Sequence, residues 1–261
     1  MTDVSEYLRG LFGLEGRRAL VTGGGRGIGR GLSLALARAG AAVVVTDVDR
    51  DGATEVARAI EDAGGRAVAL EMDCMEESSV VRGVAGAASE LGGLDILVNN
   101  AGVYPLHTLE DMEQELFDDV YRLNVRGTFL CTREAVKAMR ESGGGGAILN
   151  LASGAGKRGL QPGLGAYGPS KAAVIQFTRN AAVEFAPDGI RVNAIAPGFV
   201  RTEGTDPLFA GGLGEQLLAH QPLKIIGTPE DLVGIAIALL SQAGSFVTGA
   251  TYVIDGGFLL L

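Results

Sequence analysis

A tyrosine and a lysine lie one helical turn apart in Tyr167-Gly168-Pro169-Ser170-Lys171, and a helical pattern of apolar residues follows them. Residues at this spacing share one face of a helix, and a proline is tolerated in the first turn. Lowering the pKa of a phenol from about 10 to about 7 takes roughly 4 kcal/mol. An ammonium about 4 Å away supplies energy of that order at an effective dielectric of about 20. The pair predicts a proton-exchanging tyrosine, although the same spacing also occurs on ordinary helix surfaces.

A glycine-rich segment, Thr22-Gly23-Gly24-Gly25-Arg26-Gly27-Ile28-Gly29, stands between a short apolar run and an amphipathic helical pattern. A strand, a glycine turn and a helix start leave backbone N–H groups and the positive end of the helix dipole free to bind an anion. The spacing differs from the general Gly-x-Gly-x-x-Gly dinucleotide fingerprint. The segment predicts a diphosphate site, with a chance arrangement in a glycine-rich chain as the alternative.

Asp47 ends the second apolar run, at the place where a carboxylate binds the adenosine ribose hydroxyls of a dinucleotide. The extra phosphate of NADP would meet this carboxylate with a repulsion of roughly 4 kcal/mol, reduced by solvent screening. Arg26 and Arg50 could offset part of that repulsion. Asp47 therefore favours NAD over NADP, and the alternative is a solvated strand end or a helix cap before Asp51.

The elements that must position these residues are short apolar runs alternating with longer segments of helical spacing. The runs are uniformly apolar, as in parallel strands that helices cover on both faces. We expect strands at residues 19–22, 42–46, 67–70, 94–98, 147–151 and 191–195. The sequence predicts an α/β fold: one doubly wound Rossmann domain over residues 1–261, with a mostly or wholly parallel sheet flanked by helices on both faces.

Two segments depart from this alternation. Residues 1–15 form an N-terminal extension, whose short helix we expect to pack on the body of the protein or on a partner subunit. Residues 203–221 contain several glycines and Pro207, and they predict a lid over the binding site. An ordinary surface insertion is the alternative for this second segment.

The composition limits the partners of the chain. A net charge of −9 without a basic block argues against nucleic acid. The first residues lack the pattern of a secretory signal, and no apolar stretch reaches the roughly 18–20 residues that span a bilayer. Cys74 and Cys131 are too few for a disulfide framework and are expected to be buried. We expect a cytoplasmic protein that binds small molecules and no membrane.

Several motifs together resemble the short-chain dehydrogenase/reductase family, over the chain from about Glu15 to Gly257. They occur in the order and at the distances of that family: the glycine segment, Asn99-Asn100-Ala101-Gly102, Ser153, Tyr167 with Lys171, Pro197-Gly198, Val247-Thr248-Gly249 and Asp255-Gly256-Gly257. Their co-occurrence is far more specific than any one of them.

The resemblance implies a role for each of four residues. Tyr167 would be the general acid and base, and Lys171 would lower its pKa while binding the nicotinamide ribose. Ser153 would hydrogen-bond the substrate oxygen. Asn124 resembles the asparagine that keeps a water in the proton relay, and its alternative role is to satisfy helix backbone.

The resemblance also implies a set of cofactor contacts. Asp73 would meet the adenine amine and Asn100 to Gly102 the ribose side, unless Asn100 mainly ties strands together. Residues after the sixth strand would hold the nicotinamide amide. The full expected set is Gly23, Arg26, Gly27, Ile28, Gly29, Asp47, Asp73, Asn100, Ala101, Gly102, Tyr167, Lys171, Pro197, Gly198, Val200 and Thr202.

The expected reaction is hydride transfer between a nicotinamide cofactor and a secondary alcohol or ketone. A mixed polar and apolar mouth, with Tyr104, Gln161 and Ser153 facing the substrate, suits a small polyol, sugar or cyclic alcohol. The alternatives are a 3-oxoacyl-carrier-protein reductase using NADPH, a non-catalytic dinucleotide-binding scaffold, and a lyase or isomerase. Leu130 and Val183 stand where carrier-protein reductases often have docking arginines.

Two further expectations concern metals and assembly. His107 and His220 lie far apart without accompanying ligand spacing, so no metal site is expected. The apolar end Phe258-Leu259-Leu260-Leu261 predicts a contact surface. A homo-oligomer, either a dimer or a tetramer as in the resembling family, is therefore expected.

Overall fold

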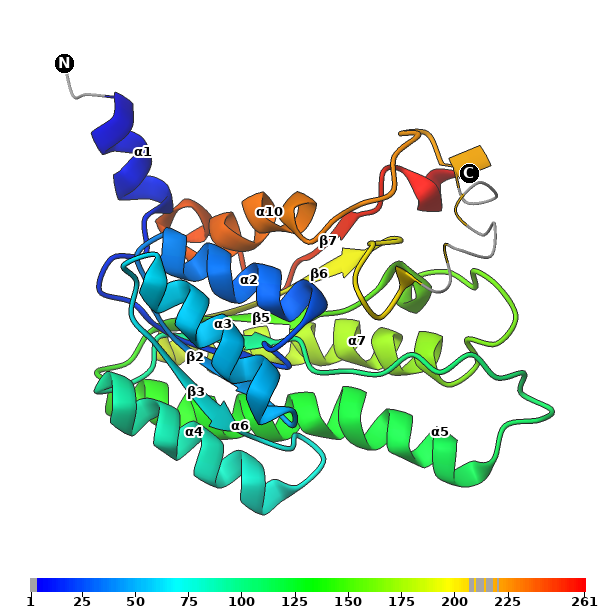
Figure 1. The fold of residues 1–261 in the computed structure, drawn as a ribbon, viewed down its shortest axis with the longest axis horizontal. Coiled ribbons are helices and arrows are strands. Elements are labelled where there is room, and N and C mark those ends of the chain that lie inside the picture. Colours follow the sequence, from blue (N-terminus) through cyan, green and yellow to red (C-terminus); the bar gives the residue numbers. More distant parts are fainter. Residues whose placement is uncertain (1–3, 207–208, 210–213, 215–217, 220) are drawn as a thin grey trace.

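Seven strands form one parallel sheet at the centre of the protein (Figure 1). The computed structural model describes residues 4–206, 209, 214, 218–219 and 221–261. Neighbouring strands follow the order β3-β2-β1-β4-β5-β6-β7, and each pair is parallel. Their bounds are β1 Arg18–Thr22, β2 Ala42–Asp47, β3 Ala67–Glu71, β4 Ile96–Asn99, β5 Gly146–Leu151, β6 Ile190–Pro197 and β7 Thr251–Ile254. The predicted doubly wound Rossmann architecture is confirmed, and the sheet is wholly parallel.

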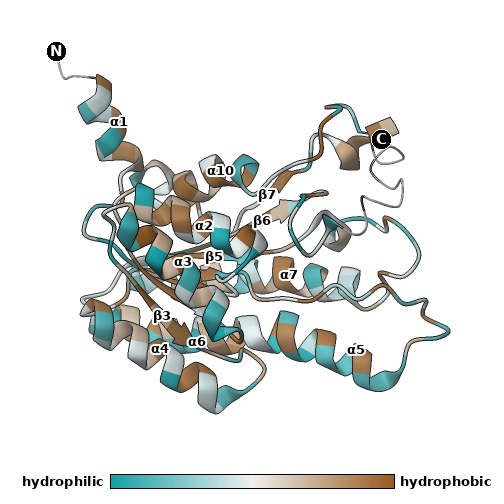
Figure 2. Cartoon of the chain, viewed as in Figure 1, coloured by the Kyte–Doolittle hydropathy of each residue, from teal (hydrophilic) through white to brown (hydrophobic). Residues whose placement is uncertain are grey.

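Helices cover both faces of this sheet. The covering helices are α2 Gly27–Arg38, α3 Arg50–Asp62, α4 Glu77–Leu91, α5 Gln114–Tyr121, α6 Thr128–Glu141, α7 Tyr167–Phe185 and α10 Glu230–Leu240, and α1 Val4–Phe12 precedes the first strand. Alternate strand residues point to opposite faces: Val21 packs with α2, α3 and α10, and Leu20 packs with α4, α6 and α7. Figure 2 shows polar colours on the outer sides of α3 and α4. None of the helices in the described ranges is long and apolar enough to cross a membrane.

The six expected strands are all present, with β4 beginning later and β6 running longer than expected. The seventh strand, β7, lies beyond the strand-turn expected at residues 247–249. It forms the sheet edge next to β6, and Tyr252 and Val253 are each more than one-third exposed there.

The two chain ends, which the sequence predicts as contact segments, are both largely exposed in the single chain. Helix α1 extends away from the body (Figure 1), with Tyr7 60% and Leu8 48% exposed. At the other end, the ring of Phe258 lies edge-on to Phe199 with 5.2 Å between centroids, but Leu260 is 83% exposed. Most of α1 therefore does not pack on the body, and packing on a partner subunit, the other expected arrangement, stays a prediction.

A chain of buried polar side chains crosses the sheet and joins two helices to it. The Asn99 amide donates to Thr132 Oγ1 on α6 at 2.9 Å and to Asn150 Oδ1 at 2.8 Å. Asn150 in turn donates to Thr178 Oγ1 on α7 at 2.9 Å. Because each group is buried, each depends on its neighbour for a hydrogen bond that water cannot supply.

Replacing Asn150 by alanine should destabilise the protein. The substitution leaves the Asn99 amide and the Thr178 hydroxyl short of buried partners, so the free energy of unfolding should fall by about 2–4 kcal/mol. Asn180→Ala, on the exposed side of the same α7, should change it by less than about 0.5 kcal/mol. Urea unfolding of both variants provides the measurement, and equal effects would contradict the proposed importance of the buried chain.

Candidate functional site

A cavity of about 780 Å³ lies at the carboxyl ends of β1, β2, β4, β5 and β6. It opens where the strand order reverses between β1 and β4, which is where ligands bind in open α/β sheets. Gly29 and Asn124, which the sequence also indicated, are not in its lining. The expected site residues that do line it are Gly23, Arg26, Gly27, Ile28, Asp47, Asp73, Asn100, Ala101, Gly102, Tyr104, Ser153, Gln161, Tyr167, Lys171, Pro197, Gly198, Val200 and Thr202.

The glycine turn is fixed to the end of β4. Thr22 Oγ1 accepts hydrogen bonds from the backbone N–H groups of Asn100 at 3.0 Å and Ala101 at 3.1 Å. The Asn100 side chain donates to the Gly23 carbonyl at 2.8 Å. Gly23 has φ +60, and a Cβ there would lie 3.0 Å from Ala101 Cα. Only glycine suits this backbone, and the Asn100 side chain serves to join the two strands.

Gly29 has a packing role. A Cβ at this position would lie 2.0 Å from the Gly23 carbonyl oxygen. Glycine therefore lets helix α2 begin directly behind the turn. This contact explains why Gly29 is required by the site without lining the cavity.

Asp47 is 7% exposed and faces the cavity. Its Oδ2 accepts from the Gly25 N–H at 3.0 Å and its Oδ1 from the Asp49 N–H at 3.1 Å. The cap of α3 is Asp49, which accepts from the Asp51 N–H at 3.1 Å, so the helix-cap alternative does not apply to Asp47. Each Asp47 oxygen keeps a further lone pair for a ribose hydroxyl.

These features fit a dinucleotide. Helix α2 begins at Gly27, and Arg26 before it provides no side-chain cap, so its first N–H groups and dipole face the region expected for the diphosphate. Asp73 also lines the cavity, and its Oδ1 accepts a hydrogen bond from the Met75 N–H at 2.8 Å. The residues therefore suit a ligand with an adenosine at one end and a diphosphate in the middle.

The opposite end of the cavity is lined by Tyr167, Lys171 and Ser153, the residues expected to exchange the proton. Lys171 is 5% exposed, and its Nζ donates to the Leu151 carbonyl at 2.7 Å. The same Nζ lies 5.8 Å from the centre of the Tyr167 ring. Ser153 follows β5, and its Oγ accepts from the Ala155 N–H at 3.1 Å. The Tyr104 ring stands edge-on to Tyr167, with 6.1 Å between centroids.

Three effects act on the pKa of Tyr167. Burial raises it, a hydrogen bond with Ser153 opposes the rise, and Tyr104 adds to it. Burial is the largest of these effects, so the lowering of this pKa by the Lys171 ammonium stays a prediction. Burial also lowers the pKa of Lys171, to about 8.

Asn124 lies in a π-helical turn, Arg122–Gly127, behind the catalytic end. Its side chain exchanges hydrogen bonds with the Val103 backbone, accepting from N–H and donating to C=O, both at 2.9 Å. It also donates to Ser170 Oγ at 3.0 Å. Asn124 thus joins the loop after β4 to the first turn of α7, next to Lys171, and its place in a proton relay stays a prediction.

Sequence reasoning missed Thr22, Ser170 and the Leu151 carbonyl as supports of the site. Thr22 stands directly before the glycine turn and Ser170 directly before Lys171, so adjacency to each motif was the available signal. The acceptor at Leu151 is a backbone carbonyl, which every residue has, so the amino-acid sequence gives no signal for it. It is found only when β5 and α7 are placed together.

The expected lid, residues 203–221, falls partly outside the described residues, at 207–208, 210–213, 215–217 and His220. Of its described part, Gly204, Thr205 and Phe209 line the cavity. Among the described residues, no cluster of His, Cys, Asp or Glu could hold a metal ion.

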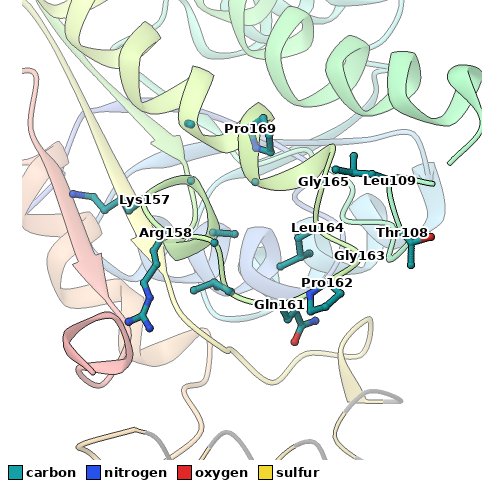
Figure 3. A pocket seen from close by; sticks show the side chains of 16 residues that line it. Thr108, Leu109, Lys157, Arg158, Gln161, Pro162, Gly163, Leu164, Gly165 and Pro169 are labelled. Atoms are coloured by element: carbon teal, nitrogen blue, oxygen red, sulfur yellow. The ribbon is translucent and has the colours of Figure 1, made fainter. Parts of the chain in front are cut away.

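A second cavity of about 720 Å³ lies beyond the segment that follows Ser153 (Figure 3). Leu160, Gln161 and Leu164 line both cavities. They therefore form a shared wall, and Gln161 is the polar side chain of these three.

Comparison with known proteins gives consistent matches over the chain. A family model described as enoyl-(acyl carrier protein) reductase matches residues 23–259. The cis-4-hydroxycyclohexanecarboxylate dehydrogenase of Sinomonas cyclohexanicum is 41% identical over 246 residues, covering 93% of this chain and 96% of the relative. The sorbitol dehydrogenase of Cereibacter sphaeroides is 38% identical over 254 residues, covering 94% and 98%.

Solved structures match equally well. A short-chain type dehydrogenase/reductase from Mycobacterium marinum superimposes with a TM-score of 0.91 at 40% identity, covering 95% of this chain and 97% of the other. A 7α-hydroxysteroid dehydrogenase complexed with NADH gives 0.91 at 36%, covering 95% and 96%. A structure assigned as an NAD(P)-dependent gluconate 5-dehydrogenase of Beutenbergia cavernae, with bound NADP, gives 0.91 at 37%, covering 97% and 100%.

Replacing Lys171 by methionine should stabilise the protein at pH 7. The folded-state pKa of about 8 lies below the ordinary value of 10.5, so the unfolded chain binds the Lys171 proton more tightly than the folded protein does. Below pH 8, the buried cation therefore lowers the free energy of unfolding. The free energy of unfolding should rise by about 1–3 kcal/mol at pH 7. Denaturant unfolding at several pH values measures it.

The same linkage predicts how the difference changes with pH. The free energy of unfolding of wild type should rise relative to that of the variant between pH 8 and pH 10.5, because over this range the folded state has lost a proton that the unfolded chain still binds. Lys157→Met, at an exposed position, serves as the control and should follow wild type throughout. A constant difference between Lys171→Met and wild type across this window would contradict the assigned burial.

Proposed function

The chain belongs to the short-chain dehydrogenase/reductase family, and from that premise we propose that it is an NAD(P)-dependent oxidoreductase interconverting secondary alcohols and ketones. One observation carries the proposal: Tyr167, Ser153 and Lys171 gather at one end of a cavity whose other end presents a glycine turn and Asp47. A proton-exchanging group and a dinucleotide cradle in one cavity suit coupled proton and hydride transfer.

The residues divide the reaction between them. The nicotinamide of the bound cofactor supplies or accepts the hydride. In alcohol oxidation, the phenolic oxygen of Tyr167 takes the hydroxyl proton while the C–H bond loses its hydride and the carbonyl forms. Ser153 holds the reacting oxygen by a hydrogen bond. The Lys171 ammonium, anchored on the Leu151 carbonyl, stabilises the deprotonated phenol.

The cofactor in this proposal is NAD in preference to NADP. Asp47 is nearly buried and faces the cavity, so an added 2′-phosphate would meet a fixed negative charge. At about 4 Å and an effective dielectric of about 20, that repulsion is roughly 4 kcal/mol before screening. Arg26 lines the cavity and offsets part of the cost. Similar structures carry NADH in one case and NADP in another, so the preference rests on Asp47.

The substrate in this proposal is a small polyol, sugar or cyclic alcohol, with a cyclic alcohol favoured. Leu106, Leu160 and Phe209 give the described substrate end apolar walls, and Tyr104 and Gln161 add hydrogen-bonding groups. Such walls suit a carbon ring that carries few polar groups. The relative from Sinomonas acts on a hydroxylated cyclohexane ring, which supports the same substrate class.

The rival activities find less support. A carrier-protein reductase needs cations that dock an acidic carrier. At the two positions compared, Leu130 is buried at 2% exposure and Val183 presents an apolar side chain that is 79% exposed. A pure dinucleotide-binding scaffold has no need of the Tyr167, Ser153 and Lys171 arrangement. The exposed Val183 also supports a homo-oligomer as part of the proposal.

Tyr167→Phe should abolish turnover and spare cofactor binding. The variant loses the group that exchanges the proton, so kcat should fall by about 10³-fold, while the Kd for NADH stays within about twofold. The measurements are reduced-cofactor absorbance with a panel of cyclic alcohols, polyols and ketones, and NADH fluorescence titration. Tyr252→Phe, on β7, is the control. Turnover of the Tyr167 variant at the wild-type rate with every active substrate would contradict the mechanism.

Asp47→Asn should shift the cofactor preference. Removing the negative charge relieves repulsion of the 2′-phosphate and weakens the contact with the ribose hydroxyls of NAD. The ratio of kcat/KM with NADP to that with NAD should rise at least about tenfold. Asp51→Asn, in the first turn of α3, should leave the ratio unchanged. A wild type that already prefers NADP would refute the assignment outright.

A further inference from the structure

The carboxylate of Glu203 lies at the start of the helix that is expected to bind the cofactor diphosphate. Its Oε2 accepts a hydrogen bond from the Gly27 N–H at 3.2 Å. Its Oε1 lies 3.6 Å from an Arg30 guanidinium nitrogen in the second turn of α2. Glu203 thus places an anion on the N-terminal N–H of α2, in the position that the helix dipole favours for a phosphate.

Glu203 lies in a hydrogen-bonded turn, residues 200–205, that fixes its position. Thr205 Oγ1 donates to the Val200 carbonyl at 2.8 Å and accepts from the Thr202 N–H at 2.8 Å. The Thr202 side chain lies 3.5 Å from the place that a Gly27 Cβ would occupy. The turn after β6 and the turn after β1 are therefore in contact, and Glu203 is held where the two turns meet.

We infer that Glu203 is an internal competitor of the cofactor diphosphate, which lowers the affinity of the protein for the cofactor. The inference rests on the proposed function for its ligand. One Gly27 N–H cannot serve both a carboxylate and a phosphate, and the two anions repel each other at contact distance. Cofactor therefore binds to the fraction of molecules in which Glu203 has moved aside, and its apparent Kd rises accordingly.

A purely structural role fits the contact less well. The side chains of Glu203 and Arg30 are 63% and 52% exposed, and exposed ion pairs contribute little to folding. Removing Glu203 should accordingly leave the thermal midpoint of unfolding near that of wild type. The affinity for a diphosphate ligand is the property that a competitor controls.

The test is isothermal titration of wild type, Glu203→Ala and Glu203→Gln with NADH, with ADP and with adenosine. We expect Glu203→Ala to lower the Kd for NADH and ADP about three- to tenfold and to leave the Kd for adenosine, which lacks a diphosphate, unchanged. Glu203→Gln keeps a hydrogen-bond acceptor and loses the charge, so its Kd values for NADH and ADP should lie between those of wild type and Glu203→Ala. Glu61→Ala, an exposed glutamate on α3, is the control for removal of a negative charge elsewhere.

The outcomes separate this inference from the proposed function. A wild type that binds ADP but shows no dehydrogenase activity would refute the function, and the ADP arm would still measure competition by Glu203. Unchanged or weaker ADP binding by Glu203→Ala would overturn the inference, because the carboxylate would then be neutral or supportive towards the diphosphate. An equal gain in adenosine affinity would overturn it as well, since the effect would not depend on the phosphates.

Discussion

The contact between the Lys171 ammonium and the Leu151 carbonyl is the interaction on which the catalytic end of the cavity depends. It joins the carboxyl end of β5 to the first turn of α7, and these two elements carry Ser153 and Tyr167. A buried amine is costly unless it is hydrogen-bonded, so this acceptor keeps the cation in place. The protein gives up folding stability here to hold a positive charge beside a phenol that burial otherwise keeps protonated.

At the other end of the cavity, hydrogen bonds between uncharged groups hold the glycine turn in place. Thr22 and Asn100 link the glycine turn to the loop after β4, so the backbone groups that we propose to bind the diphosphate are tied to the sheet. Asp47 then serves two purposes, because it accepts the Gly25 N–H and presents its remaining lone pairs to the cavity. Rigid supports of this kind allow a binding site to be formed before its ligand arrives.

The sequence predicted the features that depend on residue type and order. Uniformly apolar runs identified the six strands β1 to β6, and nearly all of the site residues that the motifs indicated line the cavity. Features that depend on depth and exposure were not predictable. The charge of Lys171 could be read from the chain, but the burial that raises the pKa of Tyr167 could not. Strand β7 was likewise not predicted, and the exposure of α1 in the single chain could not be, because the side of each element that faces solvent is set by tertiary packing.

The pairing of β1 with β4 has a consequence for how the chain reaches this structure. Ala19 lies beside Ile96, and three helices and two strands intervene between them along the chain. Closing so long a loop loses entropy before any contact compensates for it, and sheets rich in such pairings fold slowly. We therefore expect the pairing of β1 with β4, where the cavity opens, to form late during folding, after each half of the sheet has begun to assemble.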